Sequence, residues 1–312
     1  MSKAPFVVTP ALCAVAVAYK NGAMIADGVL PRVPVAAESF KYNKFPVGEF
    51  FSPPDTKVGR KGQPNQVEFT ATEATDSTED HGLDDAVPNK DSMNAAAQPG
   101  MPDPKLRAAQ GLTELIVLKR EVRAASLVFN AANYGAANKT TLVGTAQWSD
   151  FANSNPQNDI LQAQDSMIMR GNLGVMGRAV WTVIRQHPKI CKAIFGNNTD
   201  AGVVSRKQFA DHFELDDLLV GEGWVNTAKK GQPANLVRVW GKSCAILHRN
   251  MNADTEFGVT FGLTAQFGPR VAGEIVDPDI GIHGGVRVRV GESVKELVTA
   301  NDLGYLFSAA VA

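Results

Sequence analysis

The densest group of potentially reactive side chains is an acidic stretch with one histidine, between positions 76 and 85. Oxygen-rich clusters of this kind can hold Ca²⁺ or Mg²⁺, which makes a metal-assisted hydrolase one hypothesis. Its catalytic group would consist of Asp76, Glu79, Asp80 and His81. The spacing lacks the alternating oxygen ligands and the closing glutamate of an EF-hand loop. We therefore interpret the stretch as a solvated strand edge, whose charge discourages wrong pairing.

Other residue types used in catalysis are dispersed along the chain. The sequence contains five scattered histidines and no HExxH pair, GxxxxGK[ST] phosphate loop or GxSxG nucleophile elbow. Gly221-Glu222-Gly223 matches only a fragment of a dinucleotide fingerprint and favours a turn. Cys191 has apolar neighbours, so we expect a small buried hydrophobe rather than a nucleophile. The sequence therefore predicts no enzyme and no cofactor or metal site.

Composition limits the class of protein further. The 312 residues are 44% hydrophobic and 20% charged, as in folded globular proteins. The formal net charge is -1, whereas proteins that bind nucleic acid directly usually carry an excess of basic residues. Direct recognition of nucleic acid is therefore disfavoured. Three isolated cysteines suit a reducing compartment. The apolar run Phe6–Ala18 is interrupted by Pro10 and matches a signal peptide poorly. We expect a soluble, intracellular protein with no membrane span.

The acidic stretch belongs to a long predicted hairpin. The expected parts are a strand, a polar tip and a returning strand: Ser39–Phe45, Pro53–Pro64 and Val67–Thr75. The tip carries three cations, Lys57, Arg60 and Lys61. A lone two-stranded hairpin is marginal in water. Its apolar face must therefore be covered by the rest of the chain or by a neighbouring copy.

A long helix follows the hairpin. Pro88–Pro104 has no periodicity and is predicted to be a linker. Asp103 can then cap a helix that begins at Pro104 and continues to about Asn130, with an apolar face and with charged residues, Arg120 among them, on the rest of its surface. At 1.5 Å per residue it would be about 40 Å long, which is the length of a spine rather than of an ordinary globular helix.

The rest of the chain is predicted to be an α/β region. Helices are expected over Asn158–Met169, Arg178–His187, Lys189–Phe195 and from Ser205 to about Phe213. Strands are expected over Leu173–Gly177, Leu218–Gly221, Leu236–Trp240, Cys244–Leu247, Thr255–Phe267 and Val286–Val290, the last one closed by Gly291. Leu297–Thr299 and Tyr305–Val311 are expected to form a final pair around Asn301-Asp302.

The order of these elements resembles the major capsid proteins of tailed bacteriophages, which have the Hong Kong 97-like fold. The similar segments cover nearly the whole chain and include Ile25–Val35, Pro54–Arg60, Glu73–Thr78, Gly144–Asp150, Arg185–Pro188 with Trp181, Gly221–Ala228, Val239–Lys242 and Asp302–Phe307. Each motif is weak alone, but their order and spacing are specific. The resemblance implies an α+β fold in which the hairpin reaches over an adjacent subunit.

The resemblance also implies a domain organisation and partners. The implied parts are an N-terminal arm (1–35), an extended hairpin loop (36–88), a peripheral domain with the spine helix (89–164), an axial domain (165–266) and a return to the peripheral domain (267–312). Such proteins assemble through hexamers and pentamers into an icosahedral virion shell around phage DNA, in the host bacterial cytoplasm. With about thirty residues before the hairpin, we expect a separate scaffolding protein, a portal and a possible decoration protein. The contact with packaged DNA is expected to be non-specific.

A charge pattern suggests how neighbouring copies are oriented. We expect the tip cations Lys57, Arg60 and Lys61 to help place each hairpin on a neighbour, where Asp76, Glu79 and Asp80 supply complementary charge. No lysine–asparagine pair can be aligned with the covalent crosslinks of some relatives. Two further alternatives stay open beside the hydrolase: a cellular nanocompartment shell with the same fold and a non-assembling binding protein.

Overall fold

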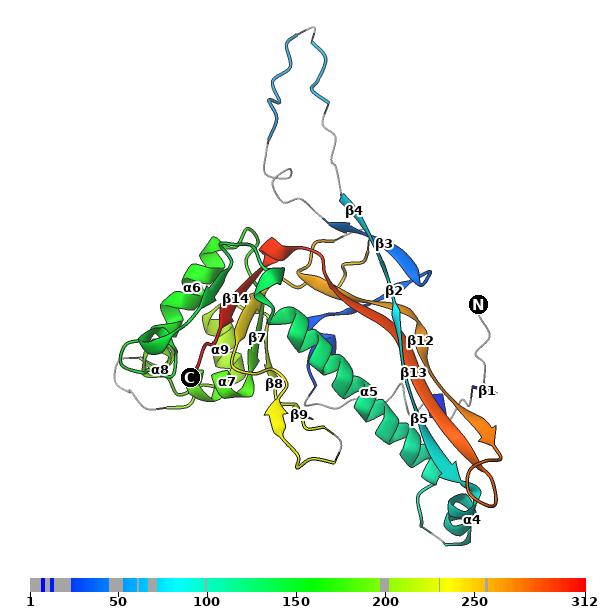
Figure 1. Ribbon diagram of the computed structural model, residues 1–312. Coiled ribbons are helices and arrows are strands. Elements are labelled where there is room, and N and C mark those ends of the chain that lie inside the picture. The colour runs from blue at the N-terminus through cyan, green and yellow to red at the C-terminus, as the bar shows by residue number, and fades with distance from the viewer. Residues whose placement is uncertain are drawn as a thin grey trace.

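The computed structural model describes residues 7–8, 12–13, 24–44, 53–60, 62–66, 72–98, 100–196, 202–229, 231–255 and 258–312. Within them the chain forms two sheet-based bodies and a projecting arm (Figure 1). A long twisted sheet carries the longest helix, and a compact five-stranded sheet carries several shorter helices. The chain is therefore of the α+β class, as the sequence predicted.

The long sheet is built on two antiparallel strands. In spatial order its strands are β1 (Val7–Val8), β12 (Gly262–Asp277), β13 (Gly285–Val298) and β5 (Glu79–Pro88), and β2 (Arg32–Val35) pairs in parallel with β12. The register between the two central strands shifts between Phe267 and Val271. Because β5 stands last in this order, the acidic residues from Glu79 to Asp85 lie on an edge strand, whereas Asp76 lies on β4 (Thr72–Ser77) of the arm base.

The helix α5 (Pro104–Val128) runs along this sheet, as predicted. The Asp103 side chain accepts a hydrogen bond from the Lys105 backbone N–H at 2.9 Å, so it caps the first turn. Twenty-five residues give a helix about 38 Å long. The buried apolar residues of its first half pack with β13 in one core cluster, which includes Ala109, Leu112, Ile116, Val288 and Val290.

The predicted linker before α5 is wrong in part. Residues Asn89–Ala97 form the helix α4, which has no buried residue. Pro88 precedes the first turn, and Asp91 places an acidic side chain within it, where the helix dipole favours negative charge. Alanine-rich composition supports a helix even where no apolar face exists. The lack of an apolar period in residues 89–97 therefore did not mean that the segment is a coil.

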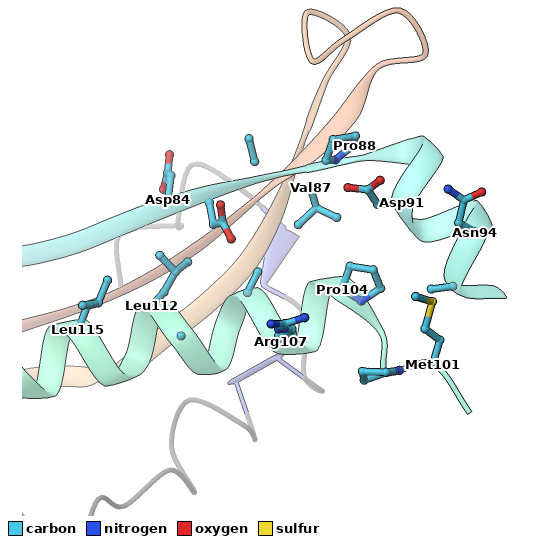
Figure 2. A pocket seen from close by; sticks show the side chains of 16 residues that line it. Asp84, Val87, Pro88, Asp91, Asn94, Met101, Pro104, Arg107, Leu112 and Leu115 are labelled. Atoms are coloured by element: carbon cyan, nitrogen blue, oxygen red, sulfur yellow. The ribbon is translucent and has the colours of Figure 1, made fainter. Parts of the chain in front are cut away.

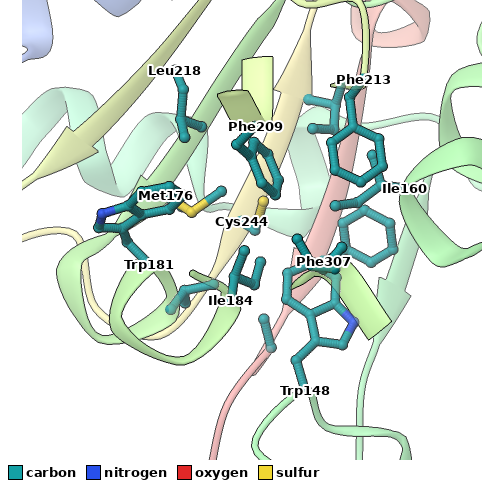
Figure 3. Packing of buried hydrophobic residues seen from close by; sticks show 14 of the residues in the cluster. Trp148, Ile160, Met176, Trp181, Ile184, Phe209, Phe213, Leu218, Cys244 and Phe307 are labelled. Atoms are coloured by element: carbon teal, nitrogen blue, oxygen red, sulfur yellow. The ribbon is translucent and has the colours of Figure 1, made fainter. Parts of the chain in front are cut away.

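The second sheet has the spatial order β6-β14-β11-β7-β8. Its strands are β6 (Lys139–Thr141), β14 (Gly304–Ser308), β11 (Cys244–Leu247), β7 (Leu173–Gly177) and β8 (Asp217–Gly221). Helices α6 (Pro156–Ser166), α7 (Arg178–Ile184), α8 (Pro188–Phe195) and α9 (Arg206–His212) accompany it. Their side chains fill a common aromatic core with the sheet, in which Trp148, Phe209, Phe213 and Phe307 meet (Figure 3).

Two predictions for the end of the chain are wrong. Strand β13 continues through Gly291 to Val298, because residues 293–298 pair with residues 262–267 of β12. Residues 304–308 do not pair with Leu297–Thr299. They form β14 between β11 and β6 of the second sheet, so the chain crosses from the long sheet to the compact one near its end. Of the strand expected over Thr255–Phe267, residues 256–257 lie outside the described residues, and β12 begins at Gly262.

The hairpin base is a two-stranded unit, β3 (Ser39–Lys44) with β4 (Thr72–Ser77). Of the predicted returning strand, residues 67–71 lie outside the described residues. Phe40 and Tyr42 are buried in a cluster with Leu263 and Leu297 of the long sheet. The apolar face of the hairpin base is thus covered by the same chain.

Short elements complete the fold. They are the helix α2 (Ala26–Val29), the 3₁₀ turns Ala131–Asn133, Gly144–Ala146 and Asn301–Leu303, and the small hairpin β9 (Trp224–Asn226) with β10 (Leu236–Arg238). In the described ranges, no helix combines the length and the apolar character that crossing a membrane requires.

Candidate assembly surfaces

The described residues of the arm tip are all exposed. The tip projects far from both sheets (Figure 1), and every described residue between 53 and 66 faces solvent. Its local order comes from a turn in which the Gly62 N–H donates to the Gly59 carbonyl at 2.9 Å. Lys57 and Arg60 lie in this exposed segment, whereas Lys61 lies outside the described residues. The tip therefore offers cationic side chains to a partner.

The acidic residues at the base of the arm contact basic and hydroxyl side chains of β13. Glu79 accepts from Lys295 Nζ at 2.6 Å, and this hydrogen bond lowers the pKa of the Glu79 carboxyl. Asp80 accepts from the Ser293 hydroxyl, and Asp76 lies 4.0 Å from Lys295 Nζ. The three acidic residues proposed from the sequence are thus brought together, but each already has a partner within its own chain.

Asp84 extends this row of cross-strand pairs. Its two carboxylate oxygens accept from Nε and Nη2 of Arg289, both at 2.6 Å, and this pairing lowers the pKa of Asp84. Opposite charges on neighbouring strands add to strand pairing. Across the ranges that the structure describes, no group of three or more His, Cys, Asp or Glu side chains is arranged to hold a metal ion.

A buried carboxylate on α5 joins three parts of the chain. Glu121 accepts hydrogen bonds from the backbone N–H groups of Ile25 and Ala26, each at 2.8 Å, and from the indole N–H of Trp240. Burial raises the pKa of the Glu121 carboxyl, while these hydrogen bonds oppose that rise. The N-terminal segment, the spine helix and the segment between β10 and β11 therefore meet at one side chain.

The expected position of Arg120 is wrong, because its side chain is only 2% exposed. The guanidinium reaches the carboxylate of Asp27 and lies 3.6 Å from Glu296 Oε1. Nearby, the buried carboxylate of Glu292 accepts from Arg32 and Arg270, both at 2.9 Å. This buried network links β2, β12, β13 and α5 directly below the arm. Sequence periodicity could not find it, because charged residues on a helix normally indicate an exposed face.

In the Gly221-Glu222-Gly223 segment, Gly221 ends strand β8 and the next two residues lead into β9, and the close packing of Trp240 explains the first glycine. A Cβ atom at Gly221 would lie 2.0 Å from Cδ1 of Trp240, whereas one at Gly223 would meet its nearest atom, Met24 Sδ, at 3.4 Å. Trp240 is fully buried and contacts Phe129 edge-to-face. The glycine therefore serves packing between the sheet and α5.

Cys191 and His187, residue types that often act in catalysis, are structural in this chain. Cys191 is buried, and burial raises the pKa of its thiol. His187 is fully buried, accepts from the Lys189 backbone N–H through Nδ1, and lies 3.1 Å from Ser154 Oγ through Nε2. Burial lowers the pKa of His187 to about 4. The imidazole caps the N-terminus of α8 in its neutral form.

Comparison with known structures identifies the class of fold. A crystal structure of a phage-related protein from Bordetella bronchiseptica RB50 superimposes with a TM-score of 0.77 at 21% identity, covering 98% of this chain and 99% of that one. The capsid structure of cyanophage P-SCSP1u gives a TM-score of 0.57 at 9% identity, covering 100% of this chain and 93% of that one. The fold is the Hong Kong 97-like fold of phage capsid proteins.

Sequence comparison then identifies the family. The major capsid protein of Pseudomonas phage JBD67 is 53% identical over 312 residues, which is 100% of both chains. The family model for phage major capsid protein E matches residues 126–239. The chain belongs to the phage major capsid protein family, so it is a shell-building protein of the virion and not an enzyme. The hydrolase and the non-assembling binding protein are thereby excluded.

Proposed function

We propose that this chain assembles through hexamers and pentamers into a closed icosahedral shell that encloses phage DNA in the host bacterial cytoplasm. A separate scaffolding protein, a portal and a decoration protein are further partners in this proposal. The DNA is confined by non-specific contacts, since the formal net charge of -1 provides no basic surplus to grip it.

The observation that carries the proposal is the exposed arm. Its base is fixed in the subunit by Phe40 and Tyr42, whereas its described tip contributes nothing to the subunit core. From Lys44 to Val58 an extended chain could reach roughly 45 Å. That distance exceeds the radius of gyration of about 20 Å expected for a compact chain of this length. An arm of this reach is suited to a neighbouring copy.

The domain organisation is part of the same proposal. The long sheet with α5 would form the peripheral domain, and the five-stranded sheet with α6 to α9 the axial domain at the centre of a capsomer. Two residues on different parts, Glu121 and Trp240, would hold the two domains together. Whereas the sequence predicted residues 267–312 in the peripheral domain, residues 304–308 pair within the five-stranded sheet, so we include this last strand in the proposed axial domain.

Charge supports a role for the arm tip in orientation. The tip cations Lys57, Arg60 and Lys61 would meet acidic residues of a neighbour, near the stretch that contains Asp76, Glu79 and Asp80. Exposed ion pairs contribute only roughly 0.2–1 kcal/mol each. In a closed lattice the same small contribution recurs at every contact.

Assembly is tested by expressing the full chain alone and together with its neighbouring phage genes. Negative-stain electron microscopy and light scattering on the same samples would detect shells or rings. Closed shells containing no cargo enzyme would support the phage shell over a nanocompartment. A chain that stays monomeric in both settings would contradict the proposal.

A further inference from the structure

A group of arginines lies at the carboxyl end of the parallel strands β7 and β8. Arg178 Nη1 and Arg206 Nη2 both donate to Glu222 Oε1, at 2.8 and 2.6 Å. Arg238 Nη1 donates to the backbone carbonyl of Glu222 at 2.7 Å. The three arginines belong to α7, α9 and β10, so the fold gathers cations that lie far apart in the sequence.

A fourth cation adjoins these arginines. Lys242 is exposed and lies in the segment that packs against the residue before Arg178, since the Gly177 N–H donates to the Ser243 carbonyl at 3.3 Å. In the contacts that the structure describes, the four cations share one carboxylate, that of Glu222. This end of the five-stranded sheet therefore carries a local excess of positive charge.

The other acidic residues of this part of the chain lie elsewhere. Asp217 begins β8, about 13 Å from the end of that strand. Glu214 is paired with Arg170, and Asp216 accepts a hydrogen bond from Asn172 at 3.0 Å. These carboxylates therefore do not neutralise the four cations.

The hollow at one end of the long sheet has the opposite character. A groove of about 800 Å³ lies between α4, β5 and the first turns of α5 (Figure 2). Asp84, Asp85 and Asp91 line it, and Arg107 is the one cation among its lining residues. Because the whole chain has a formal net charge of -1, the part outside the four cations is net acidic and repels a polyanion. A polyanion would therefore be directed to the four cations.

An exposed aromatic ring stands beside the arginines. Trp224 on β9 is 49% exposed, and the guanidinium carbon of Arg238 lies 3.9 Å from the centre of its ring, which is a cation–π contact. Guanidinium groups match the geometry of phosphate oxygens, and each of these three uses one of its five N–H groups in the contact with Glu222. The arginines thus keep donors for a further anion.

We propose that Arg178, Arg206, Arg238 and Lys242 form a phosphate-binding cluster, through which the chain contacts the backbone of the enclosed duplex DNA. The DNA is supplied by the proposed shell, so this inference rests on the proposed function. Contacts with phosphates carry no sequence information, in agreement with a non-specific contact. The contact is confined to one end of the five-stranded sheet and is not spread over the chain.

Binding of a short fluorescein-labelled DNA duplex to unassembled subunits tests the cluster. Fluorescence anisotropy is measured from about 50 to 200 mM salt for the wild type and for Arg206→Ala/Lys242→Ala, which removes two exposed cations. Four phosphate contacts predict a slope of log K against log salt of about -3.6, and two contacts predict about -1.8. The affinity of the variant at the lower salt concentration should be about tenfold lower or more.

The matched control is Lys90→Ala/Arg107→Ala. It also removes one exposed lysine and one exposed arginine, on α4 and α5 beside the acidic groove. Its affinity for the duplex and its salt slope should stay at wild-type values. An equal loss in both variants would indicate diffuse attraction and overturn the proposed cluster. Circular dichroism and the melting temperature of each variant establish that it is folded.

A competition experiment separates DNA from an acidic protein surface, such as that of a second copy. Unlabelled duplex and poly-L-glutamate are added at equal total charge to the complex with labelled duplex. The unlabelled duplex should displace the probe at the lower concentration. If polyglutamate is as effective, the cluster does not select the phosphate backbone and the proposed DNA contact is wrong.

Trp224 provides a readout that requires no change of charge. The other three tryptophans are at most 2% exposed, so acrylamide should quench mainly the fluorescence of Trp224, and Trp224→Phe identifies this signal by difference. Bound duplex should protect Trp224 from acrylamide. DNA in filled shells should protect it in the same way, relative to emptied shells. Quenching that the duplex does not change would contradict a contact at this cluster.

The outcomes distinguish the DNA contact from the proposed function. If wild-type chains form shells but Arg206→Ala/Lys242→Ala binds the duplex like the wild type, the phosphate-binding cluster is wrong while shell assembly stands. If wild-type chains form no shell in any setting, the proposed function fails even where the variant has lost its affinity for the duplex.

Discussion

The carboxylate of Glu121 accepts a hydrogen bond from the indole N–H of Trp240, and through it α5 is joined to the segment that follows β10. The same carboxylate caps two N–H groups at the start of α2. A buried carboxylate is tolerated only when its hydrogen bonds compensate for lost water. This side chain therefore fixes the spine helix relative to two other parts of the subunit.

Removing the Glu121 carboxylate should destabilise the subunit. Glu121→Ala leaves two backbone N–H groups and one indole N–H without an acceptor, and we expect a loss of about 3 kcal/mol or more in the free energy of unfolding. Glu121→Gln keeps one oxygen and avoids a buried charge, so about 1–2 kcal/mol is expected. Urea denaturation of unassembled subunits measures both. Glu114→Ala, at an exposed position of the same helix, is the control. Equal losses for Ala and Gln would refute the role of the carboxylate.

Gly221 at the end of β8 and Gly223 just before β9 should differ in their tolerance of a methyl group. Gly221→Ala forces a Cβ to within 2.0 Å of the Trp240 ring. We expect it to cost about 3 kcal/mol, the upper part of the range for overpacked cores. Gly223→Ala meets nothing closer than 3.4 Å and should be nearly neutral. Thermal unfolding of the two variants gives the comparison. Similar melting temperatures would show that the Trp240 contact relaxes without strain.

The buried ionic network should make stability depend on pH in the acid range. Burial alone would raise the pKa of Glu292, but Arg32 and Arg270 outweigh it, and the net shift is downward. A carboxyl whose pKa is lower in the folded state contributes stability above its ordinary value of 4.5, and that contribution is lost as pH falls through the lower folded pKa. Wild-type subunits should therefore lose stability as pH falls below about 4.5.

Glu292→Gln isolates the contribution of this carboxylate. At pH 7 the variant should be less stable by about 3–5 kcal/mol, because two arginines lose a buried partner. The difference from the wild type should shrink as both proteins are titrated from pH 5 towards pH 3. Denaturation curves at each pH supply the values. A difference that stays constant over this range would exclude Glu292 as the titrating group.

Charge reversal at the tip should affect assembly and leave folding unchanged. Replacing Lys57, Arg60 and Lys61 by Glu should lower the shell yield markedly, since the cations would no longer orient the arm on an acidic neighbour. The far-ultraviolet circular dichroism and the melting temperature of the subunit should stay at wild-type values.

The matched control for the tip replaces three exposed lysines elsewhere, Lys119, Lys207 and Lys229, by Glu. It changes the net charge equally without touching the arm. Normal shells from the tip variant, or an equal defect in both variants, would argue against a specific role of the tip. Light scattering and electron microscopy of parallel preparations measure the yields.

Helix-capping residues and apolar alternation in the sequence correctly predicted the helices and strands that they mark. Asp103 and Pro104 marked the start of α5, and Ser205 marked α9, where a capping box with Gln208 is present. Strand Val286–Val290 was evident from its alternation. A helix cap or an alternating strand involves residues within a few positions of one another, so it can be recognised from a single sequence.

Features that depend on distant partners were missed or only partly predicted. The second half of β13 is a strand because β12 pairs with it, and residues 304–308 cross to β11 because that strand offers an unpaired edge. The burial of Arg120 is likewise decided by Asp27 and Glu296, far away in the sequence. Secondary-structure patterns do not indicate which elements become neighbours in space, and the buried ionic network forms only between elements that are neighbours.

The anchoring of the arm base makes the arm a lever. Phe40 and Tyr42 are embedded against the long sheet, whereas the described tip is free of its own subunit. With a reach of roughly 45 Å, a rotation of about 5° at the base would displace the tip by about 4 Å, close to the spacing of adjacent strands. Small adjustments in the packing around Phe40 would thus be magnified into changes of angle between neighbouring subunits. The curvature of the shell would then depend on a few apolar contacts deep inside each subunit.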